Sequence, residues 1–298
     1  MEWLVRAAGA VIVLLVLRDM FHTLGHPEGQ GSLSRLVLRT IWRMSQYRQG
    51  RGRLGQLSGP LGLSTVIVTW GTLAVVGWAL LYLPSVPEGF IYGPGSATDS
   101  ANAPLDALYI SMITISTLGF GDVVPAPGWL RMAVPLEALF GFGLLTVAVS
   151  WVLQIYPALA RRRVLAITLS TMRRAEVVGG NQDADSVILP VLLEQLATAI
   201  IQARVDLSEY SETYYFRDTD PNSSLAAMLP YAADLAGVAK ESSQPDMRIA
   251  ARLLTGALEE FAGVLQGRFP RTTPTMSDLL AAYAIDHGHD PVKYNSSP

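Results

Sequence analysis

The sequence predicts an all-α membrane protein, and three observations lead to that fold class. Charged residues make up only 16% of the 298 residues, whereas soluble proteins carry about 25%. Residues 54–87 and residues 138–160 contain no Asp, Glu, Lys or Arg, and each run exceeds the roughly 20 residues that a helix needs to cross a bilayer. Residues 164–298 instead carry apolar side chains at intervals of three to four, which predicts a soluble helical remainder. We expect its helices at Asp185–Leu207, Ser223–Ala239, Asp246–Leu265 and Ser277–Asp286, the last with Ser277 as its N-cap.

The first apolar segment, Trp3–Leu17, is the weakest candidate for a span, because its uncharged core is short. Arg6 and Arg18 flank that core. Long arginine side chains reach toward the two interfaces, which lets a longer helix cross. We therefore expect residues 1–27 to form a retained N-terminal membrane helix.

Two stronger spans follow, at Leu61–Leu83 and Met132–Tyr156. Between them, Leu105–Thr117 is apolar but too short to cross. Residues 86–104 are rich in Gly, Pro, Ser and Asn, so we expect a loop with little regular structure there. Pro157 follows the last span, and we expect a bend at this point because proline limits the continuation of a helix.

A basic amphipathic stretch, Leu33–Arg48, lies between the first two spans. One helical face carries apolar side chains, at Leu33, Leu36, Val37, Ile41 and Met44, and the other repeats arginine, at Arg35, Arg39 and Arg43. Such a pattern is typical of a helix that lies in the membrane interface. The alternative is a solvated basic connector.

The distribution of arginine predicts the orientation. Arginines crowd before the second span and again at Arg161–Arg163, whereas Ser85–Leu130 has no Lys or Arg. Because cytoplasmic loops are enriched in positive charge, both clusters are expected in the cytoplasm. This interpretation gives a multi-pass protein of the plasma (inner) membrane, with an outside N-terminus and a cytoplasmic C-terminal domain.

The stretch Thr117-Leu118-Gly119-Phe120-Gly121-Asp122 follows the short helix. Irregular backbone at membrane depth is tolerated only where it is buried or lines a wet cavity. The two glycines allow conformations closed to other residues, so successive carbonyls can face one axis. Four copies would then stack rings of oxygen that replace the hydration shell of a cation.

This hexapeptide resembles the selectivity filter of potassium channels, and its place between a short helix and a span is similar to the prokaryotic two-transmembrane type. The resemblance implies a homotetramer in membrane lipid that binds K⁺ at Thr117, Leu118, Gly119 and Phe120. Gly121 would complete the strand and Asp122 would lie at the outer mouth. Phe120 replaces the commoner Tyr, and Ile113 stands where some members carry a Glu.

The resemblance covers about residues 60–160, and together with the apolar and arginine patterns it gives a domain organisation. Residues 58–160 would form the pore domain, after a membrane helix (1–27) and an interfacial helix with its linker (28–57). Residues 161–298 would form a cytoplasmic helical domain, which we expect to control the inner gate. The alternatives are a weakly selective cation channel and a non-conducting membrane sensor or scaffold.

Three residues of the last span stand out. Glu137 is the only carboxylate within a span, and such groups are costly and usually functional. It is expected near Ser111 or Thr114, as a hydrogen-bonded support of the filter or as a protonatable gating element. Gly141 matches the gating-hinge position of the resembled family, and both it and Gly143 serve either as a hinge or for close helix packing.

All four histidines fall in two places, at His22 and His26 and at His287 and His289. With nearby aspartates they suit a divalent metal, although surface histidines without a ligand are commoner. The chain has no cysteine, which excludes thiolate chemistry. No nucleophile and base arrangement or phosphate loop emerges, so we expect neither an enzyme nor a cofactor beyond permeant K⁺, and the net charge of −3 gives no reason to expect nucleic acid.

Overall fold

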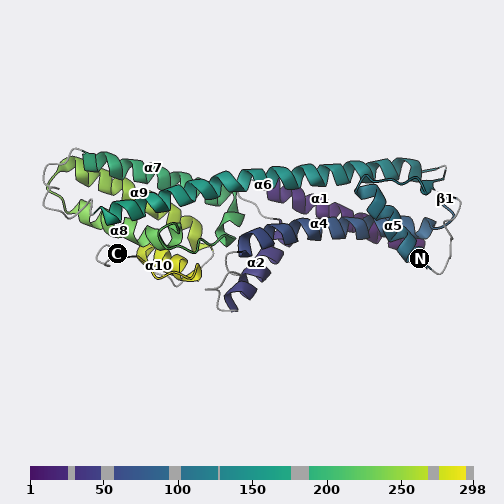
Figure 1. Ribbon diagram of the computed structural model, residues 1–298, viewed down its shortest axis with the longest axis horizontal. Coiled ribbons are helices and arrows are strands. Elements are labelled where there is room, and N and C mark those ends of the chain that lie inside the picture. The colour runs from purple at the N-terminus through teal and green to yellow at the C-terminus, as the bar shows by residue number, and fades with distance from the viewer. Residues whose placement is uncertain are drawn as a thin grey trace. The chain divides into compact units, whose positions relative to one another are not determined.

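A computed structural model describes residues 1–25, 31–47, 57–93, 102–126, 128–175, 188–267 and 275–292 (Figure 1). The expected all-α class is confirmed. The helices are α1 (Glu2–Gly25), α2 (Ser32–Tyr47), α4 (Ser58–Tyr82), α5 (Ala103–Ile115), α6 (Leu130–Arg174), α7 (Ile188–Glu209), α8 (Leu225–Lys240), α9 (Pro245–Gln266) and α10 (Met276–Asp286). Two 3₁₀ turns, η1 (Leu83–Ser85) and η4 (Ser211–Tyr215), and two short strands, β1 (Phe90–Tyr92) and β2 (Val123–Pro125), complete the described elements.

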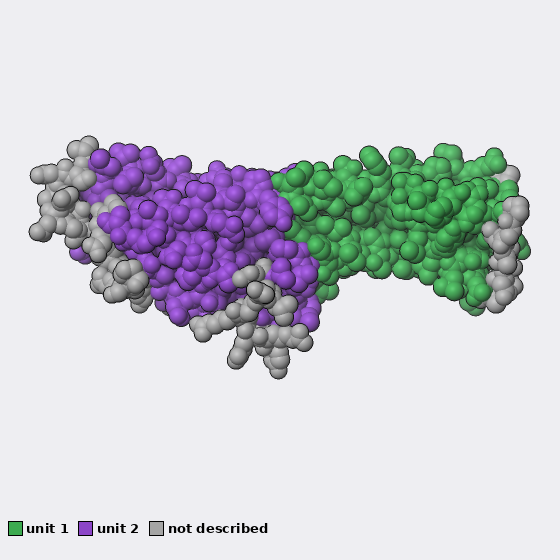
Figure 2. Space-filling model, viewed as in Figure 1, with its two compact units in different colours: residues 1–39, 62–153 green, residues 40–61, 154–298 purple. Residues whose placement is uncertain are grey.

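The chain forms two compact units, coloured separately in Figure 2. Unit 1 consists of residues 1–39 and 62–153, and unit 2 consists of residues 40–61 and 154–298. The division therefore falls within helices α2, α4 and α6 rather than in loops. It differs from the expected boundary at residues 160 and 161.

In unit 1, α1 lies antiparallel to α4 (Figure 1). The two helices approach closely at a pair of glycines, because a Cβ atom on Gly9 would lie 2.5 Å from the carbonyl oxygen of Gly77. Farther along, the indole Nε1 of Trp70 donates to Asp19 at 2.9 Å. Small residues at a helix crossing allow such backbone proximity in membranes. Contacts from residue 9 to residue 19 therefore hold α1 along α4.

The segment beyond α4 carries more regular structure than expected for residues 86–104. Strand β1 pairs antiparallel with β2, with Phe90 opposite Pro125. A short ribbon therefore links the loop to the chain that follows residues 117–122, here called the glycine motif. Phe90 anchors the ribbon in a buried cluster with Tyr82, Ile110, Leu130 and Ala133. Residues 94–101 of this loop lie outside the described part of the chain.

Helix α6 continues through Pro157 without interruption. The helix is therefore not interrupted at Pro157, and the expected bend stays a prediction. A proline removes one backbone hydrogen bond from a helix, but the apolar side chains on either side remain packed, with Ile155 and Ala158 both buried.

Unit 2 is a helical bundle in which α7, α8 and α10 pack against α9. All four expected helices of this region are present, with ends that shift by a few residues. The N-cap of α10 is Thr275 rather than Ser277: its side-chain oxygen accepts from the backbone N–H of Asp278 at 3.1 Å. The start of the expected helix Asp185–Leu207 lies outside the described residues.

Three helical segments of the described chain are long and apolar enough to cross a membrane: Ser58–Ser85, Leu130–Arg174 and Ile188–Glu209. The first two contain the expected second and last spans. Ile188–Glu209, which is α7, meets the criterion by composition although its apolar face packs on α9 within unit 2. Helix α1 has the expected continuous helical structure, and its crossing of the membrane stays a prediction.

Candidate functional site

Helix α5 delivers the chain into the glycine motif, where the backbone changes character. Thr117, Gly119 and Gly121 have φ values of 57°, 46° and 79°. Thr117 is the only non-glycine residue with a positive φ in the described part of the chain, so Leu118 and Phe120 between them have negative values. A backbone in which the sign of φ alternates can turn successive N–H groups to one side of the chain and the carbonyls to the other. The observed φ values are therefore compatible with the row of oxygens expected from the sequence.

The C-terminus of α5 fixes the start of this row. The backbone N–H groups of Leu118 and Gly119 both donate to the carbonyl oxygen of Ile113, at 3.0 and 3.1 Å, and that of Thr117 donates to Thr114 at 2.9 Å. The last carbonyls of a helix otherwise lack partners. The motif therefore serves as the cap of the short helix.

The outer end of the motif is held by two hydrogen bonds. The hydroxyl of Tyr109 on α5 donates to a carboxylate oxygen of Asp122 at 2.5 Å, and the N–H of Gly93 donates to the carbonyl of Asp122 at 2.7 Å. The bond from Tyr109 links the motif to α5 although Phe120 has no hydroxyl. It joins residues 13 positions apart, and no pattern in the sequence indicates it.

Glu137 is fully buried behind α5, as a support of the motif would be. The hydroxyl of Ser111 donates to one of its oxygens at 2.5 Å, and the hydroxyl of Tyr82 donates to the other at 2.7 Å. Ser111 is thus the α5 hydroxyl that reaches Glu137. Thr114 supports the motif through its backbone carbonyl instead. Sequence reasoning missed Tyr82, which belongs to α4.

The two glycines of α6 have different surroundings. A Cβ atom at Gly141 would lie 1.9 Å from the carbonyl oxygen of Ile115, the last residue of α5. At Gly143 a Cβ atom would meet nothing within 4 Å in the single chain. The close approach gives Gly141 a packing role next to the motif, whereas the hinge role of either glycine stays a prediction.

Asp19 is a buried site residue that sequence reasoning grouped only with the nearby histidines. Its carboxylate accepts hydrogen bonds from the first turn of α2, at the N–H groups of Leu33 and Ser34 and the hydroxyl of Ser34, over 2.6 to 3.1 Å. Trp70 adds a fourth donor from α4. A carboxylate at a helix N-terminus is stabilising. Asp19 therefore ties α1, α2 and α4 together.

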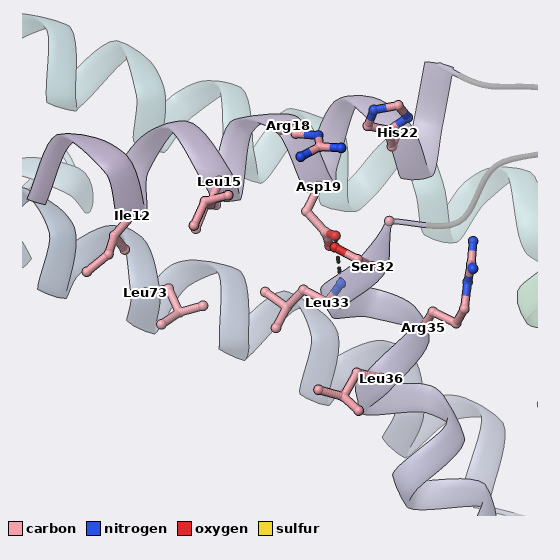
Figure 3. Close-up of a pocket in the computed structure, with 12 residues that line it drawn as sticks. Ile12, Leu15, Arg18, Asp19, His22, Ser32, Leu33, Arg35, Leu36 and Leu73 are labelled. Carbon is pink, nitrogen blue, oxygen red and sulfur yellow. Dashed lines mark hydrogen bonds between the residues drawn. The ribbon is translucent and has the colours of Figure 1, made fainter. Parts of the chain in front are cut away.

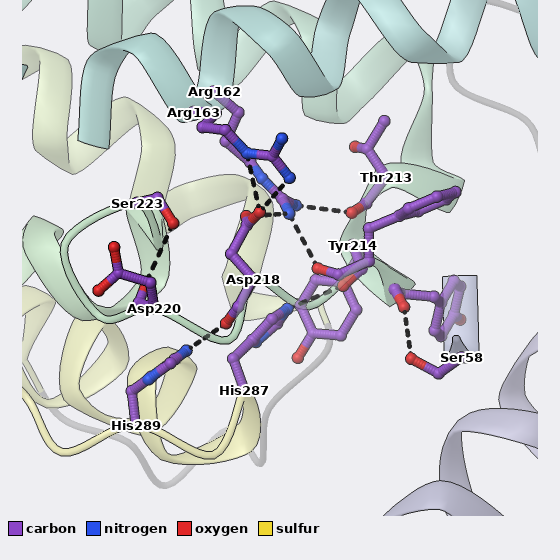
Figure 4. Close-up of polar contacts among 12 residues, drawn as sticks. Ser58, Arg162, Arg163, Thr213, Tyr214, Asp218, Asp220, Ser223, His287 and His289 are labelled. Atoms are coloured by element: carbon purple, nitrogen blue, oxygen red, sulfur yellow. Dashed lines mark hydrogen bonds and ion pairs between the residues drawn. The ribbon is translucent and has the colours of Figure 1, made fainter. Parts of the chain in front are cut away.

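The two described histidines of unit 2, His287 and His289, contact backbone carbonyls. Both ring nitrogens of the buried His287 lie against backbone carbonyls, Nδ1 at 3.0 Å from Tyr283 and Nε2 at 2.8 Å from Tyr214 (Figure 4). Nε2 of His289 lies 2.7 Å from the carbonyl of Asp218. No group of three or more metal-ligating side chains occurs among the residues described. His22 lines a cavity in unit 1, and His26 lies outside the described residues.

Within unit 2, the three arginines of the α6 cluster are all paired. Arg161 makes a bidentate ion pair with Asp206 of α7, at 2.7 and 2.8 Å. Arg162 and Arg163 both contact the buried carboxylate of Asp218 (Figure 4). These arginines are therefore structural anchors of the bundle as well as a positive cluster.

One protein-family model matches a segment of the chain that lies almost entirely in unit 1. Residues 65–156 match the family model described as an ion channel. This segment contains α5, the glycine motif and the first part of α6, so the buried Glu137 and the irregular backbone both lie within the residues that match the ion-channel model. No solved structure matches the chain.

Three curated relatives are similar to parts of the chain. The chain is 26% identical over 161 residues to the uncharacterized membrane protein YdjJ of Bacillus subtilis, covering 53% of this chain and 46% of the relative. It is 40% identical over 48 residues to the two-pore potassium channel 5 of Arabidopsis thaliana (16% and 12%). It is 34% identical over 83 residues to protein LctB of Geobacillus stearothermophilus (26% and 60%). The chain thus spans less than two thirds of the length of each of these relatives, from 12% to 60%.

Proposed function

We propose that the protein is the subunit of a homotetrameric, potassium-selective channel of the plasma membrane. Permeant K⁺ would pass along Thr117, Leu118, Gly119, Phe120 and Gly121. The observation that carries the proposal is the alternating sign of φ from Thr117 to Gly121. It sits in a segment that matches the ion-channel family.

The chemistry of this row favours a cation without its water shell. Backbone carbonyls carry partial negative charge and can replace hydrating oxygens. The C-terminal end of α5 adds the negative end of a helix dipole. The relative from Arabidopsis is named a potassium channel, and the aligned similarity is in keeping with K⁺ as the ion.

A single chain supplies only one wall of such a path. Leu118 and Phe120 are 57% and 67% exposed, although both are large apolar side chains that follow directly after α5. Side chains of this kind are expected to be covered in the assembly, and a ring of four would enclose the carbonyls. Exposed apolar side chains also lie along α6, at Met132, Leu136, Leu139, Phe142 and Leu145.

The arrangement of α1 supports an outside N-terminus. Because α1 runs antiparallel to α4 along its length, the two helices would cross the same layer in opposite directions. The arginines of α2 and Arg161–Arg163 would then lie on the cytoplasmic side, as the positive-inside rule expects. Unit 2, apart from the short segment 40–61, would be the cytoplasmic domain.

Reversal potentials of purified protein in planar bilayers, under opposed K⁺ and Na⁺ gradients, test the proposal. We expect the potential to follow the K⁺ gradient. Equal permeabilities would favour a weakly selective cation channel, and an intact tetramer without current would favour a sensor or scaffold. The Gly119→Asp variant should lose current or selectivity, because Gly119 has a positive φ and a side chain there would disturb the carbonyl row. Gly237→Ala, at an open position of α8, is the matched control and should conduct as the unmodified protein does.

A further inference from the structure

Unit 1 contains a cavity of about 570 Å³ between α1, α2 and α4. Its size is within the range of sites that bind small molecules. Ile12 and Leu15 of α1 and Leu73 of α4 line its apolar end, and Leu36 of α2 lies beside Arg35 (Figure 3). Leu15 and Leu36 remain 54% and 64% exposed, so the cavity opens to the surroundings of the helices beside both residues.

The other end of the cavity is polar and basic. Arg18 and His22 reach it from α1, and Arg35 reaches it from the first turn of α2 (Figure 3). Asp19 also lines this end, but its carboxylate already accepts four hydrogen bonds from α2 and Trp70. Among the residues that line this end, the two arginines outnumber the one carboxylate, whose oxygens already accept hydrogen bonds.

The two ends lie at different depths if α1 crosses the membrane as proposed. An α-helix rises about 1.5 Å per residue, so Ile12 and His22 are separated by roughly 15 Å along α1, which is about half of the hydrocarbon thickness. The apolar end would then face acyl chains, and the basic end would lie at the level of the headgroups. An amphipathic ligand with an anionic head matches this order.

We propose that the cavity binds an anionic phospholipid from the cytoplasmic leaflet. Its phosphate would contact Arg18 and Arg35, and its acyl chains would leave along Leu15 and Leu36. The N–H groups of the first turn of α2 would not hold the phosphate, because Asp19 occupies them. The bound lipid would pack between α1 and α2. It would hold the interfacial helix α2 against α1, whose Asp19 caps the N-terminus of α2. The inference rests on the membrane orientation under the proposed function, but not on ion conduction.

The test is lipid binding to the full chain, purified as its assembly in detergent and measured by native mass spectrometry. Phosphatidylglycerol and phosphatidylcholine with identical acyl chains are the two probes. We expect tighter binding of phosphatidylglycerol. The double variant Arg18→Ala/Arg35→Ala should weaken that binding roughly thirtyfold, which corresponds to about 1 kcal/mol for each arginine at a membrane surface.

The control is Arg39→Ala/Arg43→Ala, which removes the same charge from exposed positions of α2 that do not line the cavity. It should bind phosphatidylglycerol as the unmodified protein does. Equal losses in the two double variants would show a diffuse surface charge effect and overturn the proposal, as would equal affinity for the two lipids. Size-exclusion profiles check that both variants assemble.

A second copy of the chain is the competing occupant of the cavity. The cysteine-free sequence allows a single Leu36→Cys variant to report on access. In the lipid-free assembly this thiol should react with a maleimide, and added phosphatidylglycerol should slow the reaction. A thiol that is protected without lipid would mean that a neighbouring subunit covers the cavity, and would overturn the proposal. Because no current is measured, these results are independent of whether the pore selects K⁺.

Discussion

At the scale of single residues, the buried carboxylates Asp19 and Glu137 decide where helices meet. A buried charge is costly unless it is hydrogen bonded, and each of these two accepts from two different elements. The sequence indicates that Glu137 is unusual, because it is alone within a span. It does not reveal Tyr82 as a partner, since that contact joins positions 55 residues apart and depends on how the helices pack.

His287 makes the stability of unit 2 depend on pH. Burial, with a smaller effect from the Arg162 cation, lowers the pKa of His287 to about 3, although the two carbonyls at its ring act in the opposite direction. Below its ordinary pKa of 6.5 the unfolded chain takes up a proton that the folded chain does not. Stability should therefore fall by about 1.4 kcal/mol for each pH unit below 6.5.

Hydrogen exchange of the α10 amides measures this loss. The His287→Gln variant, compared with the unmodified protein at each pH, should lack the additional acid sensitivity between pH 6.5 and pH 5. His289→Gln is the control, because His289 has one carbonyl contact and is only partly buried. Identical acid sensitivity in the unmodified protein and His287→Gln would contradict the assignment.

At the scale of elements, α2 shows what a periodic pattern can and cannot predict. The amphipathic stretch correctly predicts a helix, and its ends differ by one residue from Ser32–Tyr47. Its buried side chains, however, include Leu38 and Trp42, whereas Leu36 and Met44 of the expected apolar face are 64% and 62% exposed. The helix carries two apolar stripes, and periodicity alone does not say which stripe packs on protein.

The contact between α5 and α6 predicts opposite effects on stability for alanine substitutions at Gly141 and Gly143. Gly141→Ala places a methyl group against the Ile115 carbonyl, so the helices must separate at the base of the glycine motif. Overpacking of this kind costs about 1–3 kcal/mol. We expect a lower melting temperature of the assembly in detergent and a smaller current.

Gly143→Ala is the matched substitution, because its added methyl group has open space in the single chain and alanine favours a helix. It should melt at or above the temperature of the unmodified assembly. If Gly141→Ala retains the original melting temperature but changes only the gating, the hinge interpretation of Gly141 replaces the packing interpretation.

At the scale of the whole molecule, composition predicts a membrane region and a soluble region. Their predicted border differs from the division between unit 1 and unit 2. Residues 40–61 precede a membrane helix, yet they belong to unit 2. The reason is tertiary: Trp42 packs against Tyr214 and Tyr215 with ring centroids 5.7 Å apart, and Ser58 donates to the carbonyl of Tyr215 at 3.1 Å. These partners lie more than 150 residues away along the chain, and no local pattern reveals them.

The continuity of α6 bears on the expected control of the inner gate by the C-terminal domain. The helix belongs to both units, so it provides a direct covalent route between the C-terminal bundle and the pore segment. Truncation after Arg163 would cut this helix internally, and a single ion pair is a sharper target. The guanidinium of Arg161 donates two hydrogen bonds to the carboxylate of Asp206 on α7.

Arg161→Ala should loosen α6 from α7 and change the ratio of open to closed channels roughly fivefold or more, the range expected for a coupling of about 1–3 kcal/mol. Single-channel recording measures that ratio. The charge exchange Arg161→Asp/Asp206→Arg should recover much of the original value, because it restores a pair between the same helices. Arg204→Ala is the control, since its pair with Glu260 is longer, at 3.8 Å, and joins α7 to α9 without touching α6.

An intact Arg161→Ala assembly with an unchanged open probability would show that the domain does not act through this pair. Loss of assembly in Arg161→Ala, rescued by the charge exchange, would instead assign the pair to holding the subunits together.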